Sequence, residues 1–211
     1  MKAKHGSLIS EGSSIGTIGT RLQTLHEPLA KFMAENSQSS RWSTLIHGDF
    51  KAANLFFSTL EERGDSNNAC PTTITACAVD FQFSGAGMPA EDLAYLLFPD
   101  AHIDYWDSES RCLEYYHGRL MESLILANKG GPSSLPLDSF VAFYELSRLE
   151  LLIYWIGKGW TGSTVGDAKL VLAVDDTLNR IESCCWMGCE KKLPDKTDYR
   201  AALDRFVNTL K

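Results

Sequence analysis

The chain lacks an excess of positive charge. Its 20 Lys and Arg residues stand against 27 Asp and Glu residues, which gives a formal net charge of −7. This balance argues against a nucleic-acid-binding protein, because binding to phosphate backbones needs a basic face. It leaves room for a nucleotide site, where local charge and Mg²⁺ offset a global deficit. No run of about 18 apolar residues occurs, so we expect no membrane span.

The spacing of a disulfide framework is also missing. The chain has 6 cysteines, and Cys184, Cys185 and Cys189 form a cluster without the paired C-x-x-C spacing or the following histidine of a zinc site. The first 19 residues are polar and small and contain no apolar core of a secretory signal. We therefore expect free thiols in a reducing compartment, and a cytoplasmic protein.

What the chain does have is enough apolar sequence for a core, since 44% of its residues are hydrophobic and 22% are charged. Residues 1–19 are rich in Gly and Ser and are predicted to be a flexible segment. The domain itself is predicted to span residues 20–211. Apolar residues recur at helical spacing in residues 20–36, and the chain after residue 107 is predicted to be helical over four further segments, 108–128, 138–157, 165–184 and 196–210.

Between these helices, the sequence predicts a small antiparallel hairpin, so the fold class is α+β. Residues 54–60 and 72–80 have strand character and flank a polar, turn-rich segment that we expect to be an exposed tip. A short buried strand is expected just before His47. Residues 84–88 are predicted to be a glycine loop that leads into a helix beginning near Pro89.

Two segments carry residues suited to phosphoryl transfer, HGDFKAAN at 47–54 and VDFQ at 79–82. The predicted hairpin brings Asn54 and Asp80 side by side, with Asp49 nearby. Carboxylate and amide oxygens are ligands that Mg²⁺ prefers. A separate carboxylate is needed to orient the attacking hydroxyl and accept its proton. Taken singly, Asp49 and Asn54 are equally well explained as turn residues.

Together, HGDFKAAN and VDFQ resemble the catalytic and metal-binding motifs of the aminoglycoside phosphotransferase and choline-kinase-like (CHK kinase-like) families, over residues 42–98. The resemblance implies a protein-kinase-like fold, with ATP and Mg²⁺ as cofactors. It implies that Asp49 is the catalytic base and that Asn54 and Asp80 bind the Mg²⁺–nucleotide complex.

The same resemblance suggests roles for three neighbours of these residues. Lys51 corresponds to a cation that neutralises the transferred phosphoryl group, although a solvated lysine explains it as well. His47 corresponds to a histidine that braces the loop and does no chemistry. Asp92 corresponds to an aspartate that hydrogen bonds to the loop backbone. As an alternative, Asp92 only favours the helix N-terminus through the dipole, by roughly 0.3–1 kcal/mol.

Kinase-like phosphotransferases also have an N-terminal lobe that grips the nucleotide phosphates. The sequence before His47 contains no G-x-G-x-x-G segment. We therefore expect the chain to be a kinase-like C-lobe without its N-lobe, either a truncated sequence or a lobe that stands alone. A lobe interface left uncovered would expose an apolar patch for the missing lobe or for a partner.

The expected function is ATP-dependent transfer of a phosphoryl group to a hydroxyl of a small molecule. A protein substrate is disfavoured, because the segment from Asp80 to Asp92 leaves no room for a long activation loop. Acidic residues such as Glu109 and Glu114 are candidates to line a site for a cationic acceptor, or else form a solvated helix start. The alternative is an inactive pseudo-phosphotransferase that serves as a small-molecule or partner-binding module. The sequence does not identify the substrate.

Overall fold

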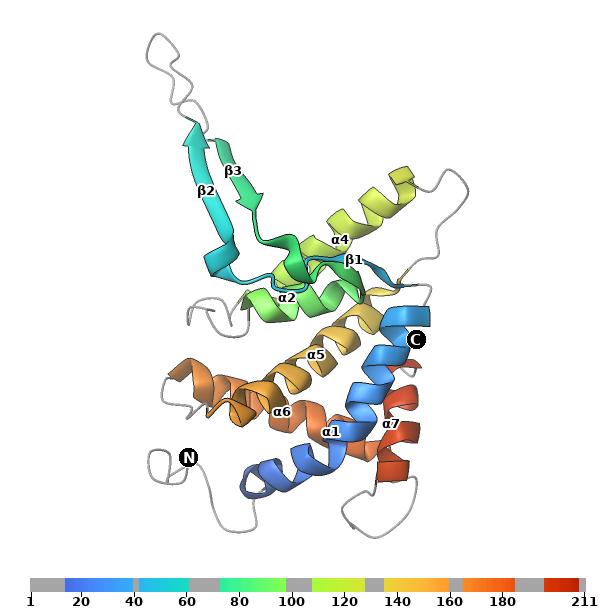
Figure 1. Cartoon of the computed structure of the whole chain (residues 1–211). Helices are drawn as coiled ribbons and strands as arrows, with labels where there is room; N and C mark the ends of the chain where they lie inside the picture. Colours follow the sequence, from blue (N-terminus) through green and yellow to red (C-terminus); the bar gives the residue numbers. More distant parts are fainter. Residues whose placement is uncertain are drawn as a thin grey trace.

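The computed structural model describes residues 14–39, 42–60, 73–97, 108–127, 135–159, 165–184 and 196–208. In chain order the helices and strands are α1 (Ser14–Ser39), β1 (Thr44–Ile46), the 3₁₀ turn η1 (Ala52–Asn54), β2 (Leu55–Leu60), β3 (Thr73–Ala78), the 3₁₀ turn η2 (Phe81–Phe83), β4 (Gly85–Gly87), α2 (Pro89–Leu97), α4 (Glu109–Ala127), α5 (Leu137–Gly157), α6 (Val165–Ser183) and α7 (Lys196–Asn208). The fold is mostly helical with small antiparallel sheets (Figure 1).

The predicted hairpin is confirmed, because β2 and β3 pair antiparallel from Leu55 opposite Ala78 to Leu60 opposite Thr73. The four helices predicted after residue 107 are also present, as α4, α5, α6 and α7. The predicted hairpin tip, residues 61–71, lies outside the described residues.

Two expectations need correction. Helix α1 begins at Ser14 and not at residue 20, so part of the predicted flexible segment is helical. Buried Ile18, only 8% exposed, extends the apolar stripe of α1 by a further turn into that segment. The predicted glycine loop contains strand β4, which pairs with β1 through residues 85–87. Residues 1–13 lie outside the described residues.

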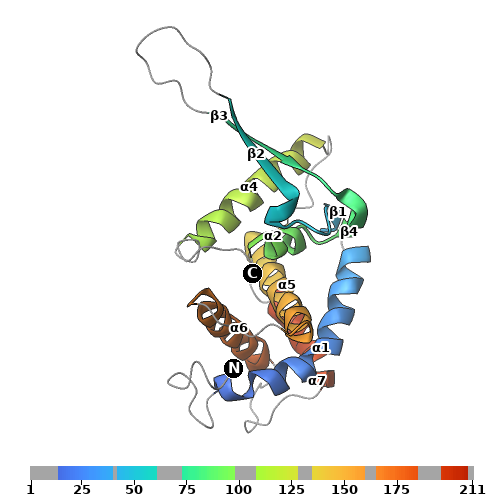
Figure 2. The ribbon, with the colours of Figure 1, turned by 60° about the vertical axis from the view of Figure 1, so that its left-hand side comes forward.

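Helix α5 forms the centre of the helical body and packs against α1, α2, α4, α6 and α7 (Figures 1 and 2). Because it has neighbours on most sides, it buries side chains around much of its circumference, including Phe140, Phe143 and Leu149. The ring of Phe143 stacks on Phe32 of α1, with 6.2 Å between ring centroids. None of the described helices has the length and apolar composition needed to cross a membrane.

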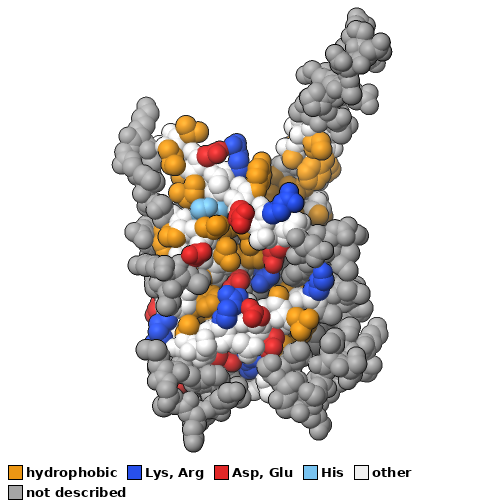
Figure 3. All heavy atoms as spheres, turned by 180° about the vertical axis from the view of Figure 1, so that it is seen from behind, with side chains coloured by type: hydrophobic (Ala, Val, Ile, Leu, Met, Phe, Trp, Pro, Cys, Tyr) orange, Lys and Arg blue, Asp and Glu red, His pale blue; other side chains and the backbone are white. Residues whose placement is uncertain are grey.

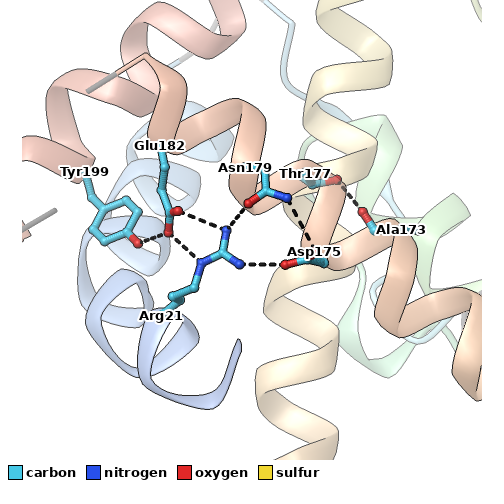
Figure 4. A network of polar contacts seen from close by, with 7 residues as sticks. All are labelled: Arg21, Ala173, Asp175, Thr177, Asn179, Glu182 and Tyr199. Atoms are coloured by element: carbon cyan, nitrogen blue, oxygen red, sulfur yellow. Dashed lines mark hydrogen bonds and ion pairs between the residues drawn. The ribbon is translucent and has the colours of Figure 1, made fainter. Parts of the chain in front are cut away.

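A buried ionic network joins α1 to α6 and α7 (Figure 4). Arg21 of α1 is 2% exposed and donates to Asp175 Oδ1 at 2.6 Å and to both carboxylate oxygens of Glu182 at 2.9 Å. Tyr199 of α7 donates its hydroxyl to the same Glu182 at 2.6 Å, and Asn179 accepts a further bond from Arg21 at 2.9 Å. Each buried charge is therefore paired and hydrogen bonded, as burial of charge requires.

The hairpin stands away from this helical body (Figures 1 and 2). Large apolar side chains on it are exposed: Phe56 is 60% exposed, Phe57 66% and Ile74 67%. Seen from behind, hydrophobic side chains gather where the hairpin joins the body (Figure 3). The register of the hairpin puts Phe57 and Ile74 on one face and Phe56 on the other, so both faces expose large apolar side chains.

We predict that Arg21→Met destabilises the protein by about 3–5 kcal/mol, because it leaves the carboxylates of Asp175 and Glu182 buried without their cation. The matched control is Arg119→Met, since the Arg119 side chain is 64% exposed and its ion pair with Glu122 lies at the surface. The control should change the free energy of unfolding by less than about 1 kcal/mol. Urea unfolding monitored by circular dichroism measures both. Equal losses for the two variants would show that the buried network does not hold these helices together.

Candidate active site

Residues 47–54 form a tight loop between β1 and the hairpin. The backbone N–H of Lys51 donates to the Asp49 carbonyl at 2.9 Å, and the N–H of Asn54 donates to the Lys51 carbonyl at 2.9 Å. The Asn54 carbonyl in turn accepts the N–H of Val79 at 3.0 Å. This last bond, next to the first pair of the β2–β3 ladder, brings the residue before Asp80 against the loop.

The carboxylate of Asp49 is largely buried, at 7% residue exposure, and is surrounded by donors. Its Oδ2 accepts from Lys51 Nζ at 2.7 Å and from Asn54 Nδ2 at 3.0 Å. The Tyr95 hydroxyl of α2 lies close to this carboxylate. The hydrogen bond from Lys51 is the main cause that lowers the pKa of Asp49, and the bond from Asn54 and the nearby Tyr95 hydroxyl act in the same direction. Asp49 is therefore ionised at neutral pH.

Lys51 is a solvent-accessible cation placed among acidic groups. The hydrogen bond to Asp49 is the main cause that raises the pKa of Lys51, and the charge of Asp80 contributes in the same direction. The ammonium group consequently stays protonated and carries positive charge beside Asp49, on the side of the loop that faces the Asp80 segment.

Asn54 and Asp80 offer the oxygen atoms that a hard cation prefers. Asn54 Nδ2 donates to both the carbonyl and the carboxylate of Asp49, so the amide oxygen is the end that remains for a ligand. Asp80 is exposed and has left-handed backbone angles, φ 64° and ψ 58°, which among non-glycine residues Asp and Asn adopt most readily. This donor set fits Mg²⁺, which uses few protein ligands and completes its shell with water and substrate phosphates.

Among the described residues, no three His, Cys, Asp or Glu side chains gather into a metal site. Cys185 and Cys189 of the C-terminal cysteine cluster lie outside the described residues.

His47 connects the loop to the strand that leads to Asp80. The N–H of Asp49 donates to His47 Nδ1 at 3.3 Å, so Nδ1 is the acceptor nitrogen of the ring. His47 Nε2 then carries the proton and donates to the Val79 carbonyl at 2.8 Å. The ring also packs on Phe81, with 4.5 Å between centroids. Both ring nitrogens of His47 are therefore hydrogen bonded to backbone groups of the site.

Asp92 holds the loop backbone from helix α2. Its Oδ2 accepts the N–H of His47 at 2.6 Å, and its Oδ1 accepts the N–H of Gly48 at 2.9 Å. A helix-dipole effect alone would leave these two bonds unexplained. The carboxylate replaces hydrogen bonds that the turn cannot make within itself, and it ties the loop to α2.

Gly48 and Tyr95 are two residues of the site that the sequence reasoning did not single out. Gly48 has φ +80°, and a Cβ there would lie 2.3 Å from the carbonyl oxygen of Phe83. Tyr95 follows Asp92 by three positions, so the helical repeat places both on one face of α2, toward the loop. This spacing was the available signal for Tyr95, but it gains meaning only once Asp92 is known to contact the loop.

Comparison with known protein families identifies the family of this chain and the superfamily that contains it. Residues 8–129 match the model of the ecdysteroid kinase-like family, which belongs to the protein-kinase-like superfamily. Because the match covers more than half of the chain, the chain belongs to the ecdysteroid kinase-like family. The matched range includes the loop, the hairpin and α2. Searches among curated proteins and among solved structures found no match.

We predict that Gly48→Ala destabilises the protein by more than about 2 kcal/mol, because left-handed strain of roughly 1–2 kcal/mol adds to the clash with the Phe83 backbone. Gly85→Ala is the matched control, since an added Cβ there meets nothing within 4 Å. The control should shift stability by about 0.5 kcal/mol or less. Chemical denaturation of both variants tests this, and a tolerated Gly48→Ala would mean that the loop adopts another conformation.

Proposed function

We propose that this chain carries the catalytic and metal-binding residues of an ATP-dependent phosphotransferase that acts on a hydroxyl of a small molecule. The observation that carries the proposal is the set of donors around Asp49. Lys51, Asn54 and Tyr95 fix one ionised carboxylate beside the amide of Asn54 and the segment of Asp80. Membership of a kinase-like family supports the same reaction class.

In this proposal Asp49 accepts the hydrogen bond of the attacking hydroxyl, orients its oxygen and takes up its proton. A carboxylate with a lowered pKa is a weak base, so orientation is its larger contribution. Phosphoryl transfer tolerates this, because its loose transition state depends on positioning and charge stabilisation more than on proton removal. Lys51 places positive charge where the transferred group gains negative charge.

Asn54 and Asp80 would hold Mg²⁺, which neutralises the phosphate oxygens of the nucleotide. A nucleotide also needs a group that grips its outer phosphates. The described residues before the loop, 14–39 and 42–46, form α1 and β1 and include no glycine-rich turn between strands. We therefore expect slow turnover by the 211-residue chain on its own and faster turnover when a phosphate-gripping lobe is supplied.

The exposed apolar side chains of the hairpin fit this expectation. We propose that Phe56, Phe57 and Ile74 contact such a lobe or a partner protein. If the chain proves inactive in every form, the same surface favours the alternative, a pseudo-phosphotransferase that acts as a binding module.

The acceptor is an alcohol of low molecular weight. The family is named for ecdysteroids, which makes a steroid alcohol one class to include beside amino sugars and amino alcohols. The resemblance to aminoglycoside and choline kinases supports the last two classes.

The first test is Asp49→Asn, which should lower the rate of phosphoryl transfer by about 10²–10⁴, because the amide neither orients the attacking hydroxyl as the carboxylate does nor takes up its proton. The assay couples ADP release to a spectroscopic signal over a panel of alcohols, with the chain alone and with a longer form that carries a phosphate-binding loop. Asp138→Asn is the control, because Asp138 lies exposed in the first turn of α5. Unchanged transfer by Asp49→Asn would refute the catalytic assignment.

Asp80→Ala should lower the activity for a different reason from Asp49→Asn. Because it removes a metal ligand and leaves Asp49 in place, we expect its activity to recover in part as the Mg²⁺ concentration rises. Asp49→Asn should show no such recovery. A Mg²⁺ titration of both variants in the same assay separates the two roles, and identical Mg²⁺ curves for Asp80→Ala and the unmodified protein would remove Asp80 from the metal site.

A further inference from the structure

A cavity of about 310 Å³ opens beside the candidate catalytic loop, between helices α2 and α5. Figures 1 and 2 show these two helices packed together below β1. The side chains and backbone that line it come from three places. Ile46 and Gly48 belong to β1 and the loop; Glu91, Asp92 and Tyr95 belong to α2; Ser147, Glu150, Leu151 and Tyr154 belong to α5. Its volume falls at the lower end of the range for small-molecule sites.

The cavity reaches the catalytic carboxylate through one residue. Tyr95 lines the cavity and lies close to Asp49, and Gly48, the residue before Asp49, also lines it. Burial is the first cause that raises the pKa of Tyr95, and the Asp49 charge adds to it, so the phenol stays protonated. A molecule in this cavity therefore lies next to the loop that carries the group that would orient the attacking hydroxyl.

Glu150 differs from the other acidic groups of the cavity in having no donor. Asp92 accepts two backbone N–H groups, and Glu91 accepts from Ser37 Oγ at 2.7 Å and from the Met88 N–H at 3.1 Å. Burial, with a smaller effect of the Glu91 charge, raises the pKa of Glu150 to about 8, and no hydrogen bond opposes this shift. No Lys, Arg or His is among the described residues that line the cavity.

We propose that this cavity binds the acceptor alcohol, and that Glu150, to which no described residue donates a hydrogen bond, selects an uncharged acceptor by a hydrogen bond between its carboxyl group and an acceptor oxygen. The inference rests on the proposed function for the reaction that follows binding. Binding itself requires neither nucleotide nor metal, so it can be tested separately.

The remaining lining favours the same class of ligand. Ile46, Leu151 and the rings of Tyr95 and Tyr154 supply apolar surface, while the two phenols and the Ser147 hydroxyl supply neutral polar groups. Asp92 is already satisfied by the loop. The Lys158 ammonium already lies over the Tyr154 ring, 5.5 Å from its centroid. A cation would therefore have Glu91, Glu150 and the face of the Tyr95 ring as partners, and Glu150 would have to lose its proton to pair with it. The titratable groups that face Glu150 are thus Glu91, Asp92 and Tyr95 on α2 and Tyr154 on α5.

Two isosteric probes test this with the full 211-residue chain. Choline and 3,3-dimethylbutan-1-ol have the same shape and a hydroxyl at the same position, but only choline is charged. Binding is measured by saturation-transfer NMR titration, without nucleotide, below and above the pKa of about 8. Below it, the alcohol should bind more tightly than choline. Above it, the affinity for the alcohol should fall roughly 3- to 10-fold, the usual net value of one hydrogen bond, while the affinity for choline should rise.

Glu150→Gln keeps the shape and a donor but removes the titration. It should bind the alcohol with an affinity that changes less than about twofold between the two pH values. Glu122→Gln, an exposed position on α4, should keep the unmodified pH dependence. Tighter binding of choline below the pKa, a Glu150→Gln protein that keeps the pH dependence, or no binding of the alcohol at either pH would overturn the proposal.

The outcomes also separate this inference from the proposed function. Glu150-dependent binding without Asp49-dependent transfer would refute the proposed function and retain the cavity as a binding site. Asp49-dependent transfer with binding that does not depend on Glu150 would refute this inference alone.

Discussion

Two hydrogen bonds accepted by the Asp92 carboxylate attach the candidate site to the helical body. They bind the backbone N–H groups of His47 and Gly48, and hydrogen bonds to charged acceptors are worth roughly 1.5–3 kcal/mol each. Helix α2, which carries Asp92, packs on the central helix α5. The position of Asp49 therefore depends on the packing of two helices that follow it in sequence, as well as on the turns of its own loop.

The same two hydrogen bonds help to explain how the site keeps left-handed backbone angles. Gly48 needs a left-handed conformation, and Asp80 adopts one as a non-glycine residue, at a cost of order 1–3 kcal/mol for such residues. His47 connects the two segments, since its ring accepts from the Asp49 N–H and donates to the Val79 carbonyl. Strain in both segments is thus held by groups that take no part in the proposed chemistry.

The sequence alone was sufficient to predict the elements that depend on local residue patterns. The hairpin followed from β-branched strands around a polar turn, and the four C-terminal helices followed from apolar spacing. Strand β4 was missed because Gly85, Ala86 and Gly87 have little strand propensity; their pairing is imposed by β1. The early start of α1 was missed because its Gly and Ser residues suggest flexibility, while Ile18 gains its burial only in the packed body.

Most contacts of the site could not be predicted from the sequence, because they depend on how distant segments pack together. Asp49, Asn54 and Asp80 lie in motifs whose spacing is informative by itself. Tyr95 is indicated only by its spacing of three residues from Asp92. Glu150 is an ordinary residue of a largely buried helix, and nothing in its local sequence indicates that α5 brings it beside the loop. Similarly, Arg21 reads as one charge on a predicted helix, although its partners Asp175 and Glu182 lie more than 150 residues away in the chain.

Two carboxyl groups, Asp49 beside the cavity and Glu150 in its lining, show how the environment produces opposite protonation states. Asp49 is buried and yet ionised, because hydrogen bonds from Lys51 and Asn54 outweigh desolvation. Glu150 is half-buried, has no such donor among the described residues and lies near the Glu91 charge, so it keeps its proton near neutral pH. When the environment separates two carboxyl pKa values in this way, one group can accept a proton while the other donates a hydrogen bond. Tyr95 lines the same cavity as Glu150 and lies close to Asp49. Under the proposed function, Glu150 recognises the alcohol inside the cavity, and Asp49, which lies outside the cavity lining, orients the hydroxyl that reaches the loop, with no change in the ionisation of either group on binding.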